Sequence, residues 1–447
     1  MKLDTRRWLI LLAGILANLC QGAAYASSVF AKPMLAHLGC MIPKMIPGPG
    51  GIKVPDPSGA MVPDMTKWAL AFSINLACLP IGMLLCGKLA DKHSSRLVVV
   101  IGGLLFGAGM FLAGFSNSLI MFYLTFGVMM GLGSGAAYGA IVASAVRWFP
   151  DFRGLASGLA VGALGFGSFV IPPVAVRLIA MGSSPETGVV LAFKVLGIAF
   201  LAIIVLASLV MVNPPADYKP AGFVPKVAAG KAAPSEGLSW TQMLAKGKFW
   251  LLYLTYACGA FSGLMIISQA SPIAQSMTKD IINLKDPKAM AEAGAAIAAL
   301  LGLANAAGRI FWGAVSDKVG RLISLAFMFL ITAITMFMLP KLVGSTGSYK
   351  IAAVLIGLCF GGYLGTFPSL CADAFGAKNM AVNYGILFSG FSVAALVGPY
   401  VAAAINKSNG SYAQAFVVAG VVSIAGFLLS IILKIGDRKT VIAVKNQ

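Results

Sequence analysis

Long apolar runs recur along the whole sequence and restrict what the chain can fold into. Twelve of them are centred near Ala17, Leu79, Leu105, Met130, Phe166, Ile203, Ala260, Leu301, Ile331, Cys359, Ala394 and Ser423. A helix needs about 20 such residues to cross the hydrocarbon core of a bilayer. The runs are continuous, whereas the strands of a membrane barrel alternate apolar with polar residues. We therefore predict an all-α membrane protein with twelve transmembrane helices.

Charge agrees with a membrane protein and sets its orientation. Only 11% of the 447 residues are charged, whereas a soluble domain carries about 25%. The net charge of +19 would suggest nucleic acid for a soluble protein, but here the distribution of charge matters more than its sum. Most of the 33 Lys and Arg residues fall in alternate loops on the same side as both termini. The positive-inside rule makes that side the cytoplasm, so we expect a multi-pass protein of the cell (inner) membrane.

The chain divides near its middle. The stretch 213–247 is rich in Pro, Ala, Gly and Lys and is too polar to span a membrane. Its composition is typical of a linker. We predict an N-terminal six-helix half over 1–212 and a C-terminal six-helix half over 248–447, joined by this cytoplasmic linker.

The two halves also repeat in sequence. Asp91 of GKLADKHSSR aligns with Asp317 of GAVSDKVGR, and Phe149 aligns with Phe375 at the same offset. Duplicated halves are typical of secondary transporters, which bind their substrate at the interface of the halves near the bilayer midplane. The repeat therefore predicts two pseudo-symmetric six-helix halves with a binding site between them.

One charge interrupts an otherwise apolar run. Arg309 lies about 12 Å along a helix axis from Asp317, close to the midplane, where a guanidinium costs about 2.5–3.5 kcal/mol. No Asp or Glu lies comparably deep in any run, and a guanidinium fits a carboxylate with two parallel hydrogen bonds. We interpret Arg309 as a ligand for a substrate carboxylate. The alternative is a structural Arg that binds backbone carbonyls or Asn305. Asn305 lies on the same helix face as Arg309, and it could orient the guanidinium, bind the substrate or hydrogen-bond to a neighbouring helix.

The loop motif supports a family resemblance. Gly87, Asp91 and Arg96 form a G-x-x-x-D-(K/R)-x-x-x-R pattern, with a degenerate copy that ends in Asp317 and Arg321. This pattern resembles the loop motif of the major facilitator superfamily, and helix count, linker and repeat extend the resemblance over the whole chain. The strings NLCQGAAYASSVFAKP, AAYGAIVASAVRWFPDFRGLASG and NAAGRIFWGAVSDKVGR are similar to the oxalate:formate antiporter family and to monocarboxylate transporters.

That resemblance implies a set of substrate contacts. In such proteins an Arg of helix eight binds the substrate carboxylate, and Arg309 matches it. A Tyr of helix one and a Tyr of helix four match Tyr25 and Tyr138. The aromatic residues of helix ten map to Phe360 and Tyr363. For each tyrosine the alternative is helix packing or a position at the membrane interface.

Two positions depart from the family pattern. Oxalate carriers place a Lys in helix eleven where this chain has Phe391, so a dicarboxylate would meet only one fixed cation. Proton-coupled animal transporters place an Asp one turn before their Arg, where this chain has Asn305. We therefore expect a small monocarboxylate such as lactate, formate or acetate, moved by alternating access as anion exchange or proton symport. Besides the monocarboxylate, the expected partners are the lipid bilayer and, in the case of symport, protons. We expect a monomer that binds no nucleic acid.

The resemblance also implies a gate at the cytoplasmic helix ends. Asp91 and Asp317 are each expected to cap the N-terminus of a helix in the opposite half, because anions stabilise helix N-termini. The arginines of the expected gate are Arg96, Arg147, Arg153 and Arg321. The alternative is a solvated loop that only sets topology.

The sequence lacks the signatures of other classes of protein. The sequence has no Walker motif, no metal-ligand spacing among its seven Cys and only two His, so we expect neither enzyme activity nor a cofactor or metal. The Gly-rich runs GLGSGAAYGA and GLCFGGYLGT are interpreted as close helix packing. A proton-driven drug exporter is the alternative within the superfamily, although the buried carboxylate that would favour it is absent from helices one and four. We expect the external loop 32–67 to be disordered decoration, with a lid or partner contact as alternatives.

Overall fold

The computed structural model describes residues 3–24, 28–47, 53–215, 218–220, 237–267, 273, 287–342, 346–409 and 412–445. The helical elements of the first half are α1 (Leu3–Gln21), η1 (Gly22–Ala24), α2 (Ser28–His37), α3 (Met65–Lys92), α4 (Ser95–Ala113), α5 (Leu119–Phe122), the π-helical segment η3 (Tyr123–Met129), α6 (Met130–Trp148), α7 (Arg153–Ala180) and α8 (Pro185–Ser208). Those that follow are α9 (Trp240–Leu244), α10 (Gly247–Ile267), α12 (Pro287–Val319), α13 (Arg321–Leu342), α14 (Thr346–Phe375), α15 (Met380–Asn409) and α16 (Ala413–Lys445).

Long helices account for almost the whole molecule. Among the described residues, 11 helices are long and apolar enough to cross a membrane. The other long helix is α12, which has 33 residues, carries Arg309 and packs against both α7 and α14. Large apolar side chains such as Leu85 (70% exposed) and Ile120 (73% exposed) cover the outside of the bundle, where hydrocarbon can solvate them. The prediction of a twelve-helix, all-α membrane protein is confirmed.

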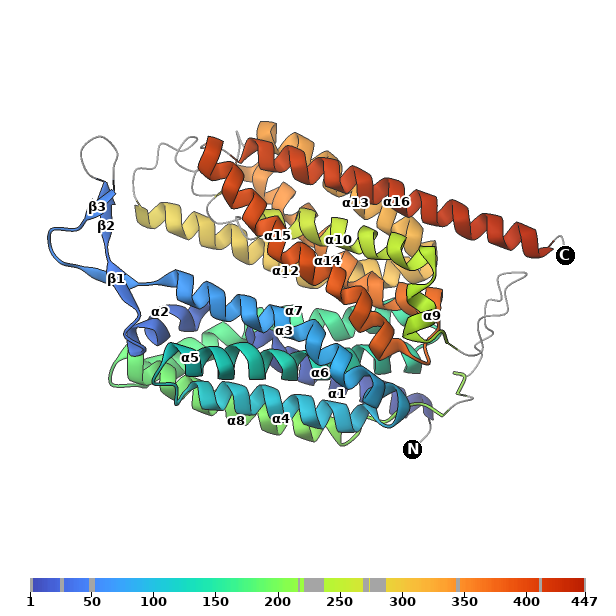
Figure 1. The fold of residues 1–447 in the computed structure, drawn as a ribbon, viewed down its shortest axis with the longest axis horizontal. Coiled ribbons are helices and arrows are strands. Elements are labelled where there is room, and N and C mark those ends of the chain that lie inside the picture. The colour runs from blue at the N-terminus through green and yellow to red at the C-terminus, as the bar shows by residue number, and fades with distance from the viewer. Residues whose placement is uncertain are drawn as a thin grey trace.

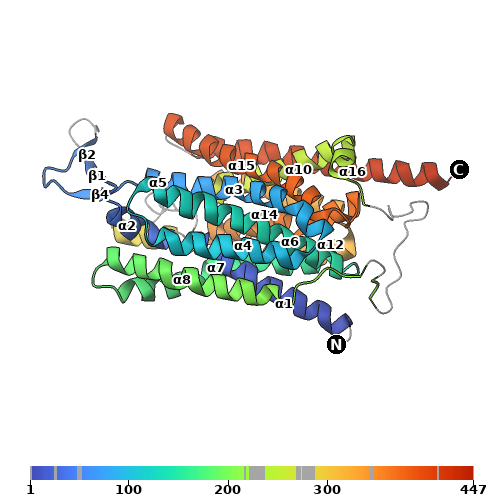
Figure 2. The ribbon, with the colours of Figure 1, turned by 60° about the horizontal axis from the view of Figure 1, so that its bottom comes forward.

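The bundle has two distinct ends. Both chain termini lie at one end, here called the terminal end, and the strands lie at the opposite end, here called the ribbon end (Figure 1). Helices of the first half, in blue to green, form one side of the bundle, and helices of the second half, in yellow to red, form the other. A view turned by 60° keeps the strands and the termini at opposite ends (Figure 2).

The segment between α2 and α3 contains two short antiparallel strand pairs. β1 (Met41–Pro43) pairs with β4 (Met61–Pro63), and β2 (Met45–Pro47) pairs with β3 (Lys53–Pro55). Each strand carries Ile or Val at its centre, and these β-branched residues lie opposite one another, as in the pairs Ile42–Val62 and Ile46–Val54. Each strand ends in Pro, which lacks an N–H to extend a ladder and so keeps the pairs short. The expectation of disorder is wrong for these described residues.

Glycines bring the helices into backbone contact. A Cβ at Gly135 of α6 would collide with the carbonyl of Leu79 on α3, and one at Gly133 would collide with the backbone of Phe106 on α4. On α14, a Cβ at Gly361 would collide with the carbonyl of Asn305 on α12. Both Gly-rich runs thus serve close helix packing, as their sequence predicts.

The halves meet through a small number of helices. From the first half, α7 packs against α12 and α14, and α3 and α6 pack against α15. The predicted linker begins at Asn213, which is held at the first half. Ser95 Oγ donates to Asn213 Oδ1 at 2.6 Å, and Asn213 Nδ2 donates to the Ala90 carbonyl at 3.3 Å. The far end of the linker is held at the second half, where the Leu238 N–H donates to the Phe375 carbonyl at 2.9 Å. The described ends of the linker therefore attach to different halves at the terminal end.

Candidate functional site

Helix packing places Arg309 between the two halves. A Cβ at Gly158 of α7 or at Gly365 of α14 would collide with the Arg309 carbonyl, and one at Gly361 of α14 would lie 3.0 Å from the Arg309 nitrogen. Only residues without a Cβ allow all of these approaches. The backbone of α12 is therefore held on one side by the first half and on another side by the second half.

The Arg309 side chain is buried, and its hydrogen bonds within the described part of the chain go to neutral groups. It is 3% exposed as a whole residue, which is less than any other charged residue that the structure describes. NH1 donates to the Val161 carbonyl of α7 at 2.7 Å, and Nε donates to Asn305 Oδ1 at 3.3 Å. No carboxylate of the described residues pairs with it. The guanidinium has hydrogen-bond partners, but none of the described residues neutralises its charge.

A second polar group reaches the adjacent carbonyl of α7. Asn18 of α1 donates from Nδ2 to the Ala160 carbonyl at 2.8 Å. Gln21 donates to Asn18 Oδ1 at 3.1 Å, and Ser134 of α6 donates to Gln21 Oε1 at 3.0 Å. These residues were missed in the sequence, where two amides three positions apart in an apolar run were the available signal. One turn of α7 thus accepts from Asn18 of its own half and from Arg309 of the other half, through Ala160 and Val161.

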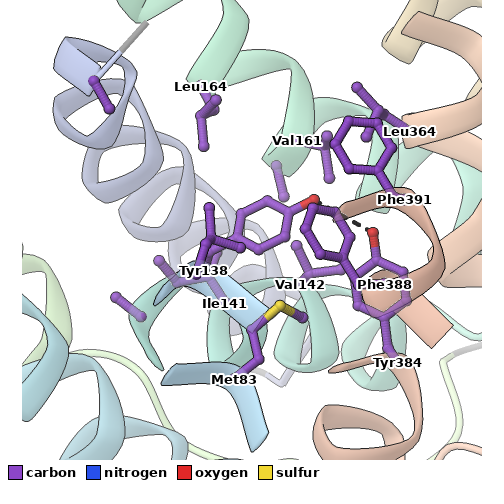
Figure 3. Close-up of a cluster of buried hydrophobic side chains, with 14 of the residues drawn as sticks. Met83, Tyr138, Ile141, Val142, Val161, Leu164, Leu364, Tyr384, Phe388 and Phe391 are labelled. Atoms are coloured by element: carbon purple, nitrogen blue, oxygen red, sulfur yellow. Dashed lines mark hydrogen bonds between the residues drawn. The ribbon is translucent and has the colours of Figure 1, made fainter. Parts of the chain in front are cut away.

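Three tyrosine hydroxyls converge from both halves. The Tyr138 hydroxyl of α6 lies 3.4 Å from that of Tyr384 on α15, which lies 3.4 Å from that of Tyr256 on α10. Figure 3 shows the first of these contacts among buried apolar side chains. Tyr256 and Tyr384 were also missed in the sequence, because tyrosine in a membrane helix most often only packs. Their convergence depends on which way each helix is turned.

Two predicted aromatic residues belong to the same cluster. Phe391 of α15 stacks with Phe388 at a ring distance of 5.0 Å and lies 6.1 Å from the ring of Phe360 on α14. Figure 3 shows Phe391 beside Leu364 and Val161, the residue whose carbonyl binds Arg309. The structure therefore brings Tyr138, Phe360 and Phe391 into one buried cluster that borders the anchor of Arg309.

The remaining predicted contacts are placed differently. The Tyr363 hydroxyl lies 3.3 Å from Thr332 Oγ1, and its ring lies 4.7 Å from Phe329. Both partners are on α13, so Tyr363 is directed into the second half and away from the inter-half cluster. Tyr25 lies outside the described residues.

Carboxylates join the halves at the terminal end. Asp91 of α3 accepts from the N–H groups of Ala381 and Val382 at 3.0 and 3.1 Å, in the first turn of α15. Asp317 of α12 accepts from Gly154 and Leu155 at 2.9 and 2.8 Å, in the first turn of α7. These N–H groups have no partner within their own helix. Each half thus satisfies the beginning of a helix in the other half, in a pseudo-symmetric pair of contacts.

Arginines extend these two contacts. Arg147 pairs with Asp91 at 3.0 Å, and Arg321 pairs with Asp317 at 2.6 Å. Asp373 of α14 pairs with Arg153 of the first half at 2.6 Å and with Arg321 of its own half at 3.0 Å. Asp373 was missed in the sequence, although the repeat aligns it with Arg147.

Arg96 stands apart from this network. It lies at the beginning of α4, is exposed, and forms no ion pair with the described residues. Of the arginines expected at the gate, the structure therefore brings together Arg147, Arg153 and Arg321 but not Arg96.

Comparisons with known proteins agree with the fold. A family model described as Major Facilitator Superfamily matches residues 14–386 and, in a second match, 289–446. An uncharacterized MFS-type transporter of Escherichia coli, YhjX, is 26% identical over 391 residues, which cover 87% of this chain and 86% of that protein. The oxalate:formate antiporter of Oxalobacter formigenes is 26% identical over 432 residues, with 96% and 91% covered. Monocarboxylate transporter 12 of Rattus norvegicus is 24% identical over 387 residues, with 83% and 78% covered.

Solved structures share the architecture at low identity. The Escherichia coli fucose:proton symporter FucP superposes with a TM-score of 0.67 at 13% identity, over 95% of this chain and 98% of that chain. The human organic anion transporter MFSD10 superposes with a TM-score of 0.65 at 15% identity, over 95% and 99%. These likenesses concern the fold.

The contacts at the terminal end lead to a first prediction. Asp317→Ala leaves the N–H groups of Gly154 and Leu155 without acceptors, and a hydrogen bond to a charged group contributes about 1.5–3 kcal/mol. Local opening of the terminal end should therefore become more than about tenfold more frequent. The measurement is the rate of maleimide labelling of Cys371, which is buried on α14, in a protein that retains it as the single cysteine.

The matched control breaks an ion pair within one half. Asp151→Asn removes the 2.7 Å contact with Arg7, and both residues belong to the first half. It should leave the labelling rate of Cys371 unchanged. Equal labelling rates in Asp317→Ala and Asp151→Asn would show that the Asp317 contact does not hold the terminal end closed.

Proposed function

The chain belongs to the Major Facilitator Superfamily of membrane transporters, and from this premise we propose that it moves a small monocarboxylate, such as lactate, formate or acetate, by alternating access. We propose further that it acts as a monomer and that the terminal end faces the cytoplasm of the cell (inner) membrane. Most of the chain's Lys and Arg residues lie in loops on the side of the termini, in accord with the positive-inside rule.

One observation carries the proposal: Arg309 is a buried cation, and no carboxylate among the described residues pairs with it. Its partners, the Val161 carbonyl and the Asn305 amide oxygen, are neutral acceptors. An unpaired charge at low dielectric is costly, and a carboxylate can accept two parallel hydrogen bonds from a guanidinium and neutralise its charge, which a carbonyl cannot do. A substrate carboxylate therefore competes well with the Val161 carbonyl for the guanidinium. Because Val161 belongs to the opposite half, that competition changes a contact between the halves.

The surroundings of Arg309 favour a single carboxylate. The cluster that borders its anchor supplies aromatic walls from Phe360, Phe388 and Phe391 for a short carbon chain, and its polar groups are the hydroxyls of Tyr138, Tyr256 and Tyr384. No second cation is buried in the described part of the chain. A dicarboxylate would leave one charge uncompensated there.

The same unpaired charge favours exchange over net transport. Reorientation of an empty carrier would move Arg309 without an anion, whereas reorientation of a loaded carrier moves a neutralised pair. Asn305, the neighbour that contacts the guanidinium, cannot titrate and so cannot supply a coupled proton. An antiporter and a monocarboxylate transporter are both among the relatives named above, so the family accommodates this assignment.

The assignment of Arg309 is tested by substitution. Arg309→Gln should fold but lose about 2–5 kcal/mol of lactate binding, because the charged partner is gone. Arg309→Lys should also be strongly impaired, since an ammonium cannot donate two parallel hydrogen bonds. Isothermal titration of the purified protein with lactate measures both. Arg96→Gln is the matched control at an exposed Arg and should bind lactate as the wild type does. Wild-type lactate affinity in a folded Arg309→Gln protein would refute the assignment.

Selectivity gives a separate test. Lactate should compete with labelled lactate for uptake much better than oxalate does. Phe391→Lys places a second cation in the aromatic cluster and should shift the preference toward oxalate, and Phe391→Leu is the control for lost aromatic packing. Uptake into proteoliposomes with either acid as competitor provides the measurement. Stronger inhibition by oxalate than by lactate in the wild type would mean that a second cation contributes to the site.

Exchange is tested by the contents of the vesicles. Proteoliposomes loaded with unlabelled lactate should accumulate labelled lactate at least about tenfold faster than empty ones, which corresponds to about 1.4 kcal/mol for moving the unpaired charge. A pH gradient alone should not drive accumulation into empty vesicles. Accumulation driven by the gradient would replace exchange with proton symport.

A further inference from the structure

A cavity at the terminal end of the second half lies apart from the site between the halves. Its volume is about 640 Å³, and it is lined by the ends of α10, α13, α14 and α16. Leu322, Ile323 and Leu370 form an apolar wall, and Lys248, Lys434 and Asp437 line it together with the ion-paired Arg321 and Asp373. An apolar interior beside charged groups suits a ligand that is itself amphipathic.

The cavity lies at the level where the membrane ends. The four spans that form it are Gly247–Ile266, Arg321–Pro340, Gly347–Phe375 and Ala413–Asp437. The lining residues Lys248, Arg321, Asp373 and Asp437 each lie at or within two residues of an end of these spans. Charged groups at span ends are at the depth of lipid headgroups, and the apolar wall extends toward the hydrocarbon.

Two of the helices that line the cavity present apolar side chains to the lipid. On α16, Ile432 and Ile435 are 53% and 50% exposed on either side of Lys434, and on α13 Phe327 is 52% exposed. Apolar side chains this exposed in a membrane protein face hydrocarbon. A lipid molecule next to α13 and α16 can therefore reach the cavity between their ends.

The residues that line the cavity include one more cation than carboxylate. Asp437 pairs with Lys248 at 2.7 Å, and Asp373 is shared by Arg321 and Arg153. Lys434 forms no ion pair with the described residues. The lining therefore has three cations and two carboxylates, and each carboxylate is already paired. An incoming anion would find Lys434 available.

We propose that this cavity binds an anionic phospholipid, with the headgroup phosphate at Lys434 and part of an acyl chain against Leu322, Ile323 and Leu370. Basic pockets between membrane helices near the cytoplasmic surface are suited to anionic headgroups. A free phosphate would use the cation but gain nothing from the apolar wall. The bound lipid would lie beside Arg321 and Asp373, which take part in the ion pairs that join the halves.

The test measures lipid retention on the purified full-length chain. The detergent-solubilised protein is mixed with equal amounts of phosphatidylglycerol and phosphatidylcholine of identical chains, and bound lipid is counted by native mass spectrometry. The wild type should retain phosphatidylglycerol in preference. Lys434→Gln should weaken that retention about fivefold, the effect expected for one basic residue at a membrane surface. Lys92→Gln removes an exposed cation at the terminal end of the first half and should change nothing.

Two further arms separate the possible sources of the anion. Ala374→Trp fills the cavity while it keeps every cation, and it should reduce phosphatidylglycerol retention as well. Millimolar inorganic phosphate should not displace the lipid. Equal retention of the two lipids by the wild type, or no effect of Lys434→Gln, would overturn the proposal. Displacement of the lipid by phosphate would show that the site binds a free anion and would overturn the proposal of a lipid site.

Discussion

A bilayer interior offers no water to backbone N–H and C=O groups, and the rest of this structure depends on that constraint. Long helices satisfy these groups everywhere except in their first and last turns. At the terminal end, the first turns of α7 and α15 are satisfied by Asp317 and Asp91 from the opposite halves. The first turn of each of these helices needs acceptors for its N–H groups, and because the acceptor comes from the opposite half, the contact also connects the halves.

The same constraint explains where the buried polar side chains go. Asn18 and Arg309 both donate to carbonyls of α7, and Asn75 donates to the Phe126 carbonyl in the π-helical segment η3 at 2.8 Å. A wide helical turn loosens the normal hydrogen-bond ladder, so a side-chain amide finds an accessible acceptor there. Arg309 differs from the two amides because a neutral carbonyl cannot balance its charge. This residual imbalance is the physical basis of the proposed carboxylate site.

Position in the membrane separates the two anion sites that we propose. Arg309 is held in the interior by Gly158, Gly361 and Gly365, whose missing side chains bring α7 and α14 against α12. Lys434 lies near the end of a span, where an ammonium can stay hydrated while apolar walls lie beside it. The deep site at Arg309 suits a small acid that is dehydrated when it binds. The shallow site at Lys434 suits a lipid whose headgroup stays largely hydrated.

The sequence by itself determined where the helices lie, how the halves repeat and which charged residues interrupt or border the apolar runs, because apolar runs and isolated charges are visible in the sequence itself. Arg309, Asp91 and Asp317 could therefore be singled out from the amino-acid sequence alone. The partners Tyr256, Tyr384 and Asn18 could not, and neither could the direction in which Tyr363 points. A membrane helix is apolar on its packed face and on its lipid face alike, so periodicity does not reveal how the helix is rotated. Only tertiary packing decided that rotation, because the partner helix that each glycine face or polar side chain meets is set by contacts between helices and is not written within one helix.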